Sequence, residues 1–357
     1  MFQHVLLTCQ NKMQKERSIS AVYYLLQGKQ SIQTIQDAQL FGLTEYYGVY
    51  KNLTKRRFFV FVNKLVEQKL LQPSTNTNFY YITDKGKKRF AGSVNNLEYL
   101  SGFRFRQFDQ TFFCRLLLLI QVLTNSKKRN FTYIPIIENI DIENWVKMYY
   151  QHVKEDIDNY LKRLHDELTS ILKQLPFNQP SVFLDQITSY HIVGLTANQT
   201  AKKLQMNEED IHLITTNVIH LMLATIIKQQ QKYPYLYSIG KDLFSQILLT
   251  QSADRTRKLL EQQYTIEEIA QIRHLKINTI YDHVVEIALY DQNFSLIPYI
   301  SKVDQQEIIQ AIRRINSYKL KDIKEAVNEN ISYFQIRLVL TQINNFNSGS
   351  VIDESIR

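Results

Sequence analysis

The sequence predicts a mainly α-helical protein with a small β hairpin in its first third. Only 9 Gly and 6 Pro occur in 357 residues, whereas sheet proteins and enzymes with glycine-rich loops need many more such breakers. Apolar residues recur at helical spacing along most of the chain. A chain of this length can bury two or three cores. We expect a basic domain at 1–98, a helical middle domain at 99–245, a second helical domain at 246–345 and a flexible tail at 346–357.

Two capped helices open the first domain. Ser18 or Ser20 can cap a helix that ends at Gly28. Ser31 can cap a second helix, and a connector rich in Tyr and Phe follows it.

A third helix and a hairpin complete this domain. The helix is expected to begin at 55–57, to close at Leu71 and to stop at Pro73. Residues 79–83 predict a short strand, and 84–89 predict a turn followed by a basic run. Helices followed by such a hairpin resemble a winged helix, which is the helix-turn-helix variant with a β wing.

The positive charge of the chain is confined to its first third. The formal net charge is +9, and residues 1–110 carry 16 Lys/Arg against 7 Asp/Glu. The remaining residues carry 27 of each sign. A basic excess of this kind indicates a module that binds a polyanion, attached to a neutral body. We expect the polyanion to be nucleic acid.

The candidate DNA-binding residues of this module lie at the start of the third helix and on the expected wing. Cations there can neutralise phosphates and release counterions, so binding should depend steeply on salt. One alternative is that these charges only solvate a helix start and a loop, and another is that the winged helix binds a protein. The candidates are Lys55, Arg56, Arg57, Lys64, Lys85, Lys87, Lys88 and Arg89.

Aromatic residues are interleaved with these cations. Tyr46, Tyr47, Tyr50 and Phe79 could stack on unpaired bases. Packing in the core or the wing is the commoner role of such side chains, and it is the one we expect for most of them.

Long helices dominate the middle domain. Residues 116–123, 145–164 and 168–175 show helical periodicity, and Pro176 and Pro180 break the run. The apolar run around 116–120 is far shorter than a membrane span and indicates a buried helix.

A helix-turn-helix pattern follows in the same domain. Thr196 can cap a helix, Ala201 permits a close helix crossing, and Ile211 lies ten residues later. The second helix would begin with three carboxylates at 208–210, which would repel phosphate. We therefore expect this element to be structural or to face another protein. His212 and His220 lie eight residues apart on one helix face, and both are expected to be in the core or half-buried.

The same pattern returns more clearly in the last domain. Thr265 and Glu268 form a capping box, Ala270 permits the close crossing, and Ile280 fills the core. A shift of 69 residues aligns Thr196 with Thr265. The same shift aligns Ala201 with Ala270 and Ile211 with Ile280. This alignment indicates an internal duplication.

The motif at 265–283 resembles the helix-turn-helix domain at the C-terminal end of some RecQ-family helicases, which also occurs in YpbB-like helix-turn-helix proteins. That resemblance implies a DNA-binding protein without enzymatic activity, or a partner of a helicase. Arg273 and His283 are expected to pack and hydrogen-bond rather than touch DNA. The matching residues are Thr265, Ile266, Ile269, Ala270, Arg273, Leu275, Thr279, Ile280 and His283.

The second helix of this motif is the candidate recognition helix. Asn278 and Tyr281 could contact bases or phosphates, so both are candidate DNA-binding residues. Asp282 and Glu286 are expected on the same exposed face and would oppose a strong electrostatic grip. Direct DNA binding and docking on a protein therefore both stay open for this module.

The sequence carries no signature of an enzyme. Residues 28–31 superficially resemble a phosphate loop, but Tyr23 stands where that motif needs Gly. The two cysteines, Cys9 and Cys114, cannot form a Cys-rich metal cluster, and they predict a reduced, cytoplasmic protein without a signal peptide. We expect no catalytic residue, no metal, no cofactor, no small-molecule substrate and no membrane association.

Three functions fit these observations. The favoured one is a DNA-binding accessory protein that works with a RecQ-like helicase in DNA repair or recombination. A protein-interaction adaptor, whose helix-turn-helix elements dock on a helicase, is the second. A transcription regulator is the third.

Overall fold

The computed structural model describes residues 1–343 except 76–77, 92–95, 177, 245–248 and 292, with only the backbone of 90 and 91. The expected tail at 346–357 lies outside the described residues. The expectation of a mainly helical protein is confirmed, because the described chain is built from helices and a single pair of three-residue strands.

The chain forms two compact units, each made of three separate segments. Unit 1 comprises residues 1–8, 45–61 and 85–246, and unit 2 comprises 9–44, 62–84 and 247–357. Helices α1 (Phe2–Met13) and α4 (Lys55–Glu67) contribute residues to both units. The expected division into three domains stays a prediction.

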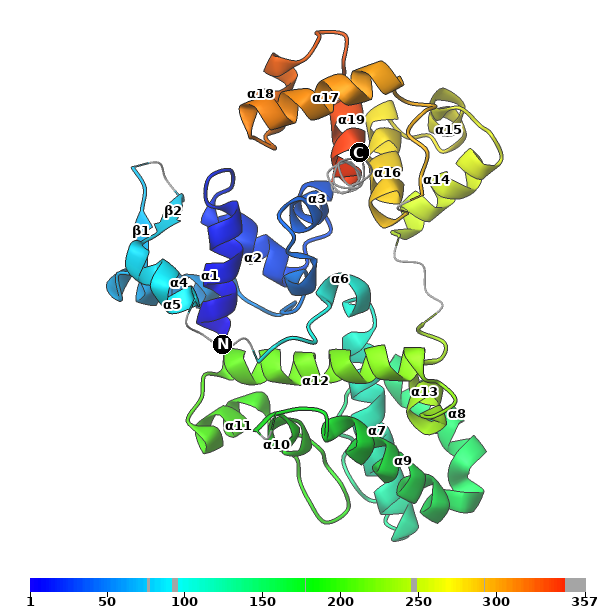
Figure 1. Ribbon diagram of the computed structural model, residues 1–357. Coiled ribbons are helices and arrows are strands. Elements are labelled where there is room, and N and C mark those ends of the chain that lie inside the picture. The colour runs from blue at the N-terminus through cyan, green and yellow to red at the C-terminus, as the bar shows by residue number, and fades with distance from the viewer. Residues whose placement is uncertain (76–77, 92–95, 177, 245–248, 292, 344–357) are drawn as a thin grey trace, which may run out of the picture. The chain divides into compact units, whose positions relative to one another are not determined.

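Unit 1 is organised around the long helix α12 (Glu208–Lys228). Helices on several sides pack against α12 (Figure 1). The other helices of the unit are α5 (Asp84–Ala91), α6 (Gly102–Phe105), α7 (Asp109–Lys127), α8 (Ile140–Val153), η2 (Lys154–Asp156), α9 (Ile157–Leu172), α10 (Asn178–Leu184), α11 (Ala197–Leu204) and α13 (Pro234–Gly240), and η1 (Thr44–Tyr46) lies at its edge.

Helix α12 is buried because it is apolar almost all the way round. By length and composition it is the one helix of the described chain that could cross a membrane, but 78% of its most apolar window is buried inside the protein. This burial is that of a core helix. The apolar run of α7 is buried as expected, with Leu116 fully inaccessible.

A buried polar network fixes α12 to its neighbours. His220 is fully buried, and its Nδ1 accepts a hydrogen bond from the Ser101 N–H at 2.9 Å. Its Nε2 then donates to Asp109, 3.3 Å away, and Lys51 Nζ lies 2.9 Å from the same carboxylate. Burial alone would raise the pKa of Asp109, but the hydrogen bond from His220 and the charge of Lys51 lower it. The expected core position of His220 is confirmed.

The middle helices divide at a different place from the expected one. The sequence predicts a helix over 145–164, whereas α8 ends at Val153 and α9 begins at Ile157 after the short 3-10 turn η2. Nothing in the local sequence forbids a continuous helix there. Across this break Tyr149 Oη of α8 lies 2.8 Å from Tyr160 Oη of α9.

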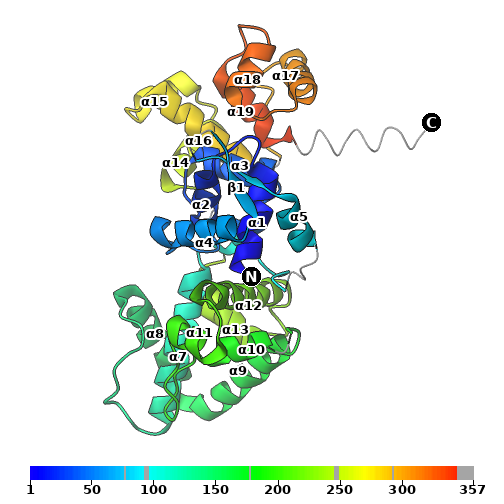
Figure 2. The same ribbon diagram turned by 90° about the vertical axis from the view of Figure 1, so that its left-hand side faces the viewer.

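Unit 2 combines an early part of the chain with the C-terminal helices. Its elements are α2 (Ile19–Gln27), α3 (Ile32–Leu40), β1 (Leu71–Pro73), β2 (Tyr80–Ile82), α14 (Gln251–Glu261), α15 (Ile266–Ile272), α16 (Ile277–Tyr290), α17 (Lys302–Ile315), α18 (Leu320–Ala326) and α19 (Tyr333–Thr341). Figure 2 shows α17, α18 and α19 side by side, and the three helices pack on one another.

Helix α3 covers α16 and α19 in this unit. Gln36 Nε2 donates to the backbone oxygen of Arg337 at 2.9 Å, and Gln39 Nε2 donates to that of Leu289 at 2.7 Å. A further bond joins the Tyr318 N–H to Glu16 at 2.7 Å. Residues 9–44 are therefore part of the same packed body as the C-terminal helices.

The expected positions of the first helix ends are confirmed, although the Ser18 side chain makes no capping hydrogen bond. Ser18 is the N-cap of α2, and Gly28 ends that helix with a left-handed φ of 72°. Ser31 caps α3 by accepting a hydrogen bond from the Thr34 N–H.

The hairpin is present, but its surroundings differ from the expectation. Strands β1 and β2 pair antiparallel, and Pro73 lies in β1 opposite Tyr80 instead of stopping a helix. Helix α4 has already ended at Glu67. Proline is tolerated because each strand of a two-stranded sheet has an edge that needs no N–H. The predicted turn at 84–86 is wrong, since these residues and the basic run at 87–89 form α5, whose acidic first turn and basic last turn suit the helix dipole.

Helix α1 was not expected from the sequence. Phe2, Val5, Leu6, Cys9 and Met13 are all fully buried. Their spacing of three or four residues is the helical pattern that could have identified it.

Candidate nucleic-acid interface

The start of α4 presents two cations. Lys55 and Arg56 are exposed and make no hydrogen bond or ion pair with the described part of the chain. Thr54 precedes them, and its hydroxyl accepts from the Arg57 N–H at 3.3 Å. Cations at a helix N-terminus oppose the helix dipole, so these two charges do not stabilise α4. They are available for phosphate.

Arg57 has a different environment from its two neighbours. Its guanidinium spans Glu208, with N–O distances of 3.3 and 2.7 Å, and its Nε lies 2.9 Å from Glu209. The hydrogen bonds with Glu208 raise the pKa of Arg57, and they lower the pKa of Glu208. This side chain is bound within unit 1, so a phosphate would have to displace two carboxylates.

Each of the three carboxylates at the start of α12 has a partner within unit 1. Glu208 and Glu209 bind Arg57, and Asp210 accepts from the Phe2 N–H at 2.7 Å. Three acidic residues in the first turn also suit the dipole of α12. Of the two roles expected for this element, structural or facing another protein, these contacts support the structural one.

The remaining basic candidates lie on separate elements. Lys85, Lys87, Lys88 and Arg89 are exposed on α5, and Lys64 is exposed on the later part of α4. Figure 2 shows α4 and α5 as separate elements on two sides of α1. Lys88 and Arg89 make no ion pair with the described residues.

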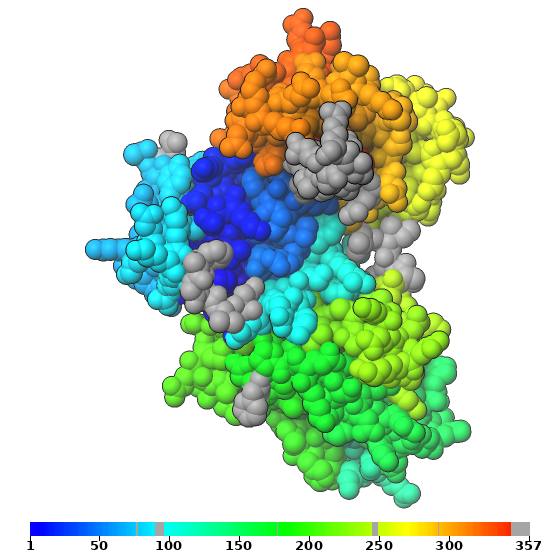
Figure 3. Space-filling view, in the orientation of Figure 1, coloured from blue at the N-terminus to red at the C-terminus, as the bar shows by residue number. Residues whose placement is uncertain are grey.

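Unit 1 carries nearly all of the net charge. Its segments contain 24 Lys/Arg and 16 Asp/Glu, whereas those of unit 2 contain 19 and 18. The segment that holds α4, the hairpin and α5 is visible at the surface in Figure 3. The charge that favours a polyanion therefore belongs to unit 1.

The two helix-turn-helix elements have the same turn, residue for residue. In the first, the Met206 N–H donates to the Ala201 oxygen at 2.9 Å, and Gln205 has a φ of 54°. Sixty-nine residues later Leu275 donates to Ala270 at 3.0 Å, and His274 has a φ of 51°.

The caps of these two elements match as well. Thr196 with Gln199, and Thr265 with Glu268, both form complete capping boxes. The predicted capping box at Thr265 is confirmed.

A hydrogen-bond network fixes the second element. Arg273 donates to the Ser252 backbone oxygen at 2.8 Å and to the Thr256 hydroxyl. His283 Nδ1 lies 2.9 Å from that hydroxyl. Burial lowers the pKa of Arg273, and burial followed by the charge of Arg273 lowers the pKa of His283. The expectation that both residues pack and hydrogen-bond is confirmed.

The face of α16 that was expected to be exposed is partly covered by α19. Tyr281 stacks on Phe334 with ring centroids 4.0 Å apart, and Asp282 lies 2.8 Å from Arg337. Asn278 is exposed.

The expectation that Glu286 is exposed on that face is wrong. Glu286 is buried, and its carboxylate accepts from the N–H and the hydroxyl of Thr250 ahead of α14. The carboxylate therefore binds the N-cap residue of α14 instead of facing solvent. It has no role in an acidic surface on α16.

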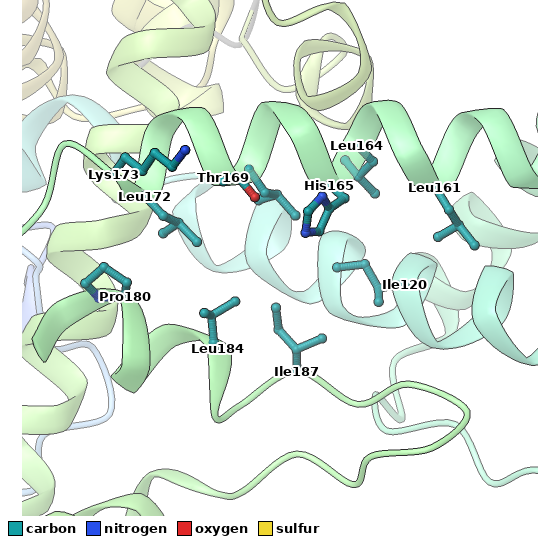
Figure 4. A pocket seen from close by; sticks show the side chains of 11 residues that line it. Ile120, Leu161, Leu164, His165, Thr169, Leu172, Lys173, Pro180, Leu184 and Ile187 are labelled. Atoms are coloured by element: carbon teal, nitrogen blue, oxygen red, sulfur yellow. The ribbon is translucent and has the colours of Figure 1, made fainter. Parts of the chain in front are cut away.

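An apolar pocket of about 430 Å³ lies within unit 1, between α7, α9 and α10 (Figure 4). Its lining is aliphatic except for His165 and Thr169 of α9 and Lys173, the C-cap residue of that helix. Such a lining offers little to a phosphate backbone, so the pocket is not part of the candidate interface.

Mainly helical architecture and two capped helix-turn-helix turns define a helix-turn-helix protein. A family model described as a helix-turn-helix domain matches residues 252–340, and a domain of this class suggests DNA binding.

The chain is 31% identical over 348 residues to Protein YpbB of Bacillus subtilis (strain 168), covering 96% of this chain and 97% of that protein. The chain therefore belongs to the YpbB family. No solved structure matches it.

Proposed function

We propose that this protein is a non-enzymatic, cytoplasmic DNA-binding accessory protein that works with a RecQ-like helicase in DNA repair or recombination. The observation that carries the DNA-binding part is the pair of unpartnered cations, Lys55 and Arg56, in the unit that holds the net charge. The helix-turn-helix match supports the same class of function. The helicase partnership rests on the resemblance of the C-terminal domain.

The winged-helix assignment of residues 18–89 belongs to this proposal. The order of helices followed by an antiparallel hairpin supports it. Lys88 and Arg89 would act from α5, as a second group of cations separate from the start of α4.

The test is DNA affinity measured over a salt series for duplex, forked and single-stranded DNA. Each phosphate contact that is lost should lower the slope of log affinity against log salt by about 1. We expect the Lys55→Ala/Arg56→Ala variant to lose about 2 from the slope and to bind more weakly to every sequence.

The matched control is Lys162→Ala/Arg163→Ala. These two exposed cations are adjacent on α9 in the same unit and make no ion pair with the described residues. The control removes the same charge from a different surface and should keep the slope of the wild type. Equal losses in both double variants would show that only the total charge matters, and would remove the assignment to α4.

A docking role for the C-terminal helix-turn-helix is the second candidate function. The observation in its favour is that α19 covers part of the recognition helix, through the Tyr281–Phe334 stack and the Asp282–Arg337 pair. DNA contact through unit 1 and protein contact through unit 2 are compatible with one accessory protein.

A further inference from the structure

A cleft of about 590 Å³ lies within unit 2, on the helix-turn-helix domain. The end of α14, the start of α15, one face of α16 and the start of α19 form its walls. The lining residues are Leu260, Gln263, Tyr264, Thr265, Ile266, Glu267, Tyr281, Pro298, Tyr299, Ser332, Phe334 and Gln335. They include four aromatic rings and one charged group, which is a carboxylate.

Three of the four aromatic rings pack against one another and form one wall of the cleft. Tyr281 stacks on Phe334 with centroids 4.0 Å apart, and Tyr299 meets Phe334 edge to face at 6.0 Å. Tyr264 has an exposed fraction of 40%, and its ring makes no contact with another ring in the described chain. The wall of packed rings and the accessible ring of Tyr264 therefore line the same cleft.

Glu267 is the charged group of the cleft, and its carboxylate has no hydrogen-bond or ion-pair partner among the described residues. Across the described part of 251–343, this is true of one other acidic side chain, Glu329. The remaining carboxylates there all have a partner: Asp254, Glu261, Glu268, Asp282, Glu286, Asp291, Asp304, Glu307, Asp322 and Glu325.

The composition of the cleft selects a cation and disfavours phosphate. No Lys or Arg lines it, so its one charged side chain is the carboxylate of Glu267, which would repel a nucleic-acid backbone. Aromatic faces attract cations through the ring quadrupole, and Arg is the side chain found there most often. Its planar guanidinium can stack on a ring while it donates two hydrogen bonds to a carboxylate.

We propose that this cleft binds an arginine side chain of a partner protein, which stacks against Tyr264 and pairs with Glu267. The rim supports a protein partner, because Ile297 and Tyr333 adjoin the lining residues Pro298 and Phe334 with exposed fractions of 65% and 50%. A protein that covers these exposed apolar side chains would also exclude water from an ion pair at the centre of the cleft. The inference deepens the docking role proposed above and rests on it.

The experiment uses the full chain, immobilised, and pools of nine-residue peptides with uncharged randomised flanks. One pool has Arg fixed at the centre, and the matched pool has citrulline, which is the uncharged isostere of Arg. We expect the Arg pool to be retained about tenfold better, which is the gain of one cation–π contact and one ion pair. Glu267→Gln and Tyr264→Ala should each abolish most of this preference.

Glu329→Gln is the control, since it removes the other unpartnered carboxylate of the domain and should keep the preference. Equal retention of the Arg and citrulline pools by the wild type would overturn the proposal. It would also be overturned if Glu329→Gln reduced the preference for the Arg pool as much as Glu267→Gln does. Displacement of the Arg pool by a fifteen-residue oligothymidine would show a nucleobase site instead. DNA affinity of the Glu267→Gln variant is measured on the same preparation, so a failed cleft leaves the salt-series test of the proposed function intact.

Discussion

Neighbouring residues of identical charge have opposite roles in this protein. Arg56 and Arg57 are adjacent at the start of α4, yet Arg56 has no partner in the described chain and Arg57 binds two carboxylates of α12. A helix turns by about 100° per residue, so adjacent side chains point in different directions. The sequence shows a basic run, but the direction of each side chain decides which charge reaches solvent.

Arg57→Ala should therefore destabilise the protein and leave DNA binding nearly unchanged. It would leave the buried Glu209 without its partner, and we expect the unfolding free energy to fall by about 1–2 kcal/mol, reduced because Arg57 is partly exposed. Urea denaturation checks this value.

Arg56→Ala is the matched comparison for that variant. It should show the opposite result, with unchanged stability and a weaker salt dependence of DNA binding. The assignment fails if Arg57→Ala weakens DNA binding more than Arg56→Ala does.

Unit 2 should lose stability in acid because His283 is buried in its neutral form. Burial holds the pKa of His283 below its usual 6.5 in the folded protein, so the unfolded chain binds a proton that the folded chain does not. The stability that His283 contributes is then present above about pH 6.5 and lost as the pH falls below it.

Thermal denaturation between pH 7.5 and 5.5 measures this effect. His283→Gln should flatten part of the decline in midpoint temperature, whereas His191→Gln, at an exposed position, should follow the wild type. Identical slopes for the wild type and His283→Gln would show that His283 does not titrate in this range.

Among the elements, the repeated turn is the clearest case of a structure that the sequence predicts. The alignment of Thr196 with Thr265 and of Ala201 with Ala270 is matched by equal hydrogen bonds and equal left-handed residues. The surroundings of the two second helices differ. Arg57 and the Phe2 N–H bind the start of α12, whereas α19 covers part of α16. The turn is determined locally, and the exposed face is determined by packing.

The left-handed residue should respond to substitution in the same way in both turns. Gln205→Gly and His274→Gly each remove the steric cost of a positive φ, and we expect each to stabilise the protein by about 0.5–1 kcal/mol. His274→Val should destabilise it by about 1–2 kcal/mol, since a branched side chain is disfavoured there. Chemical denaturation of the three variants tests this, and opposite signs at the two Gly substitutions would contradict the equivalence.

At the scale of the whole molecule, chain order and spatial order differ. The sequence located the caps, the repeated turn, the hairpin strands and the mainly helical class, because each depends on a few neighbouring residues. It did not reveal that 9–44 joins the C-terminal helices, since the bonds of Gln36 and Gln39 reach across 301 and 250 residues. The partner of Arg57, 151 residues away, was hidden for the same reason.

A fragment of residues 247–357 should consequently be less ordered than the same residues in the full chain. Without α3, the faces of α16 and α19 that it covers would be open to water. Amide hydrogen exchange in α19 should be at least about tenfold faster in the fragment, because local opening becomes easier when packing is lost.

Exchange in α17, which packs on α18 and α19, provides the internal reference. A separate peptide of residues 9–44, mixed with the fragment, should slow the amide exchange of α19 again. Equal protection of α19 in the fragment and in the full chain would show that α3 adds nothing to its stability.

The burial of α3 against α19 has a consequence for synthesis on the ribosome. Close to 300 residues separate these two helices in the chain, and at the usual 5–20 residues per second the later one emerges about 15–60 s after the earlier one. During that interval the nascent segment 9–44 carries an uncovered face, so this stretch is where a chaperone would be needed while translation proceeds.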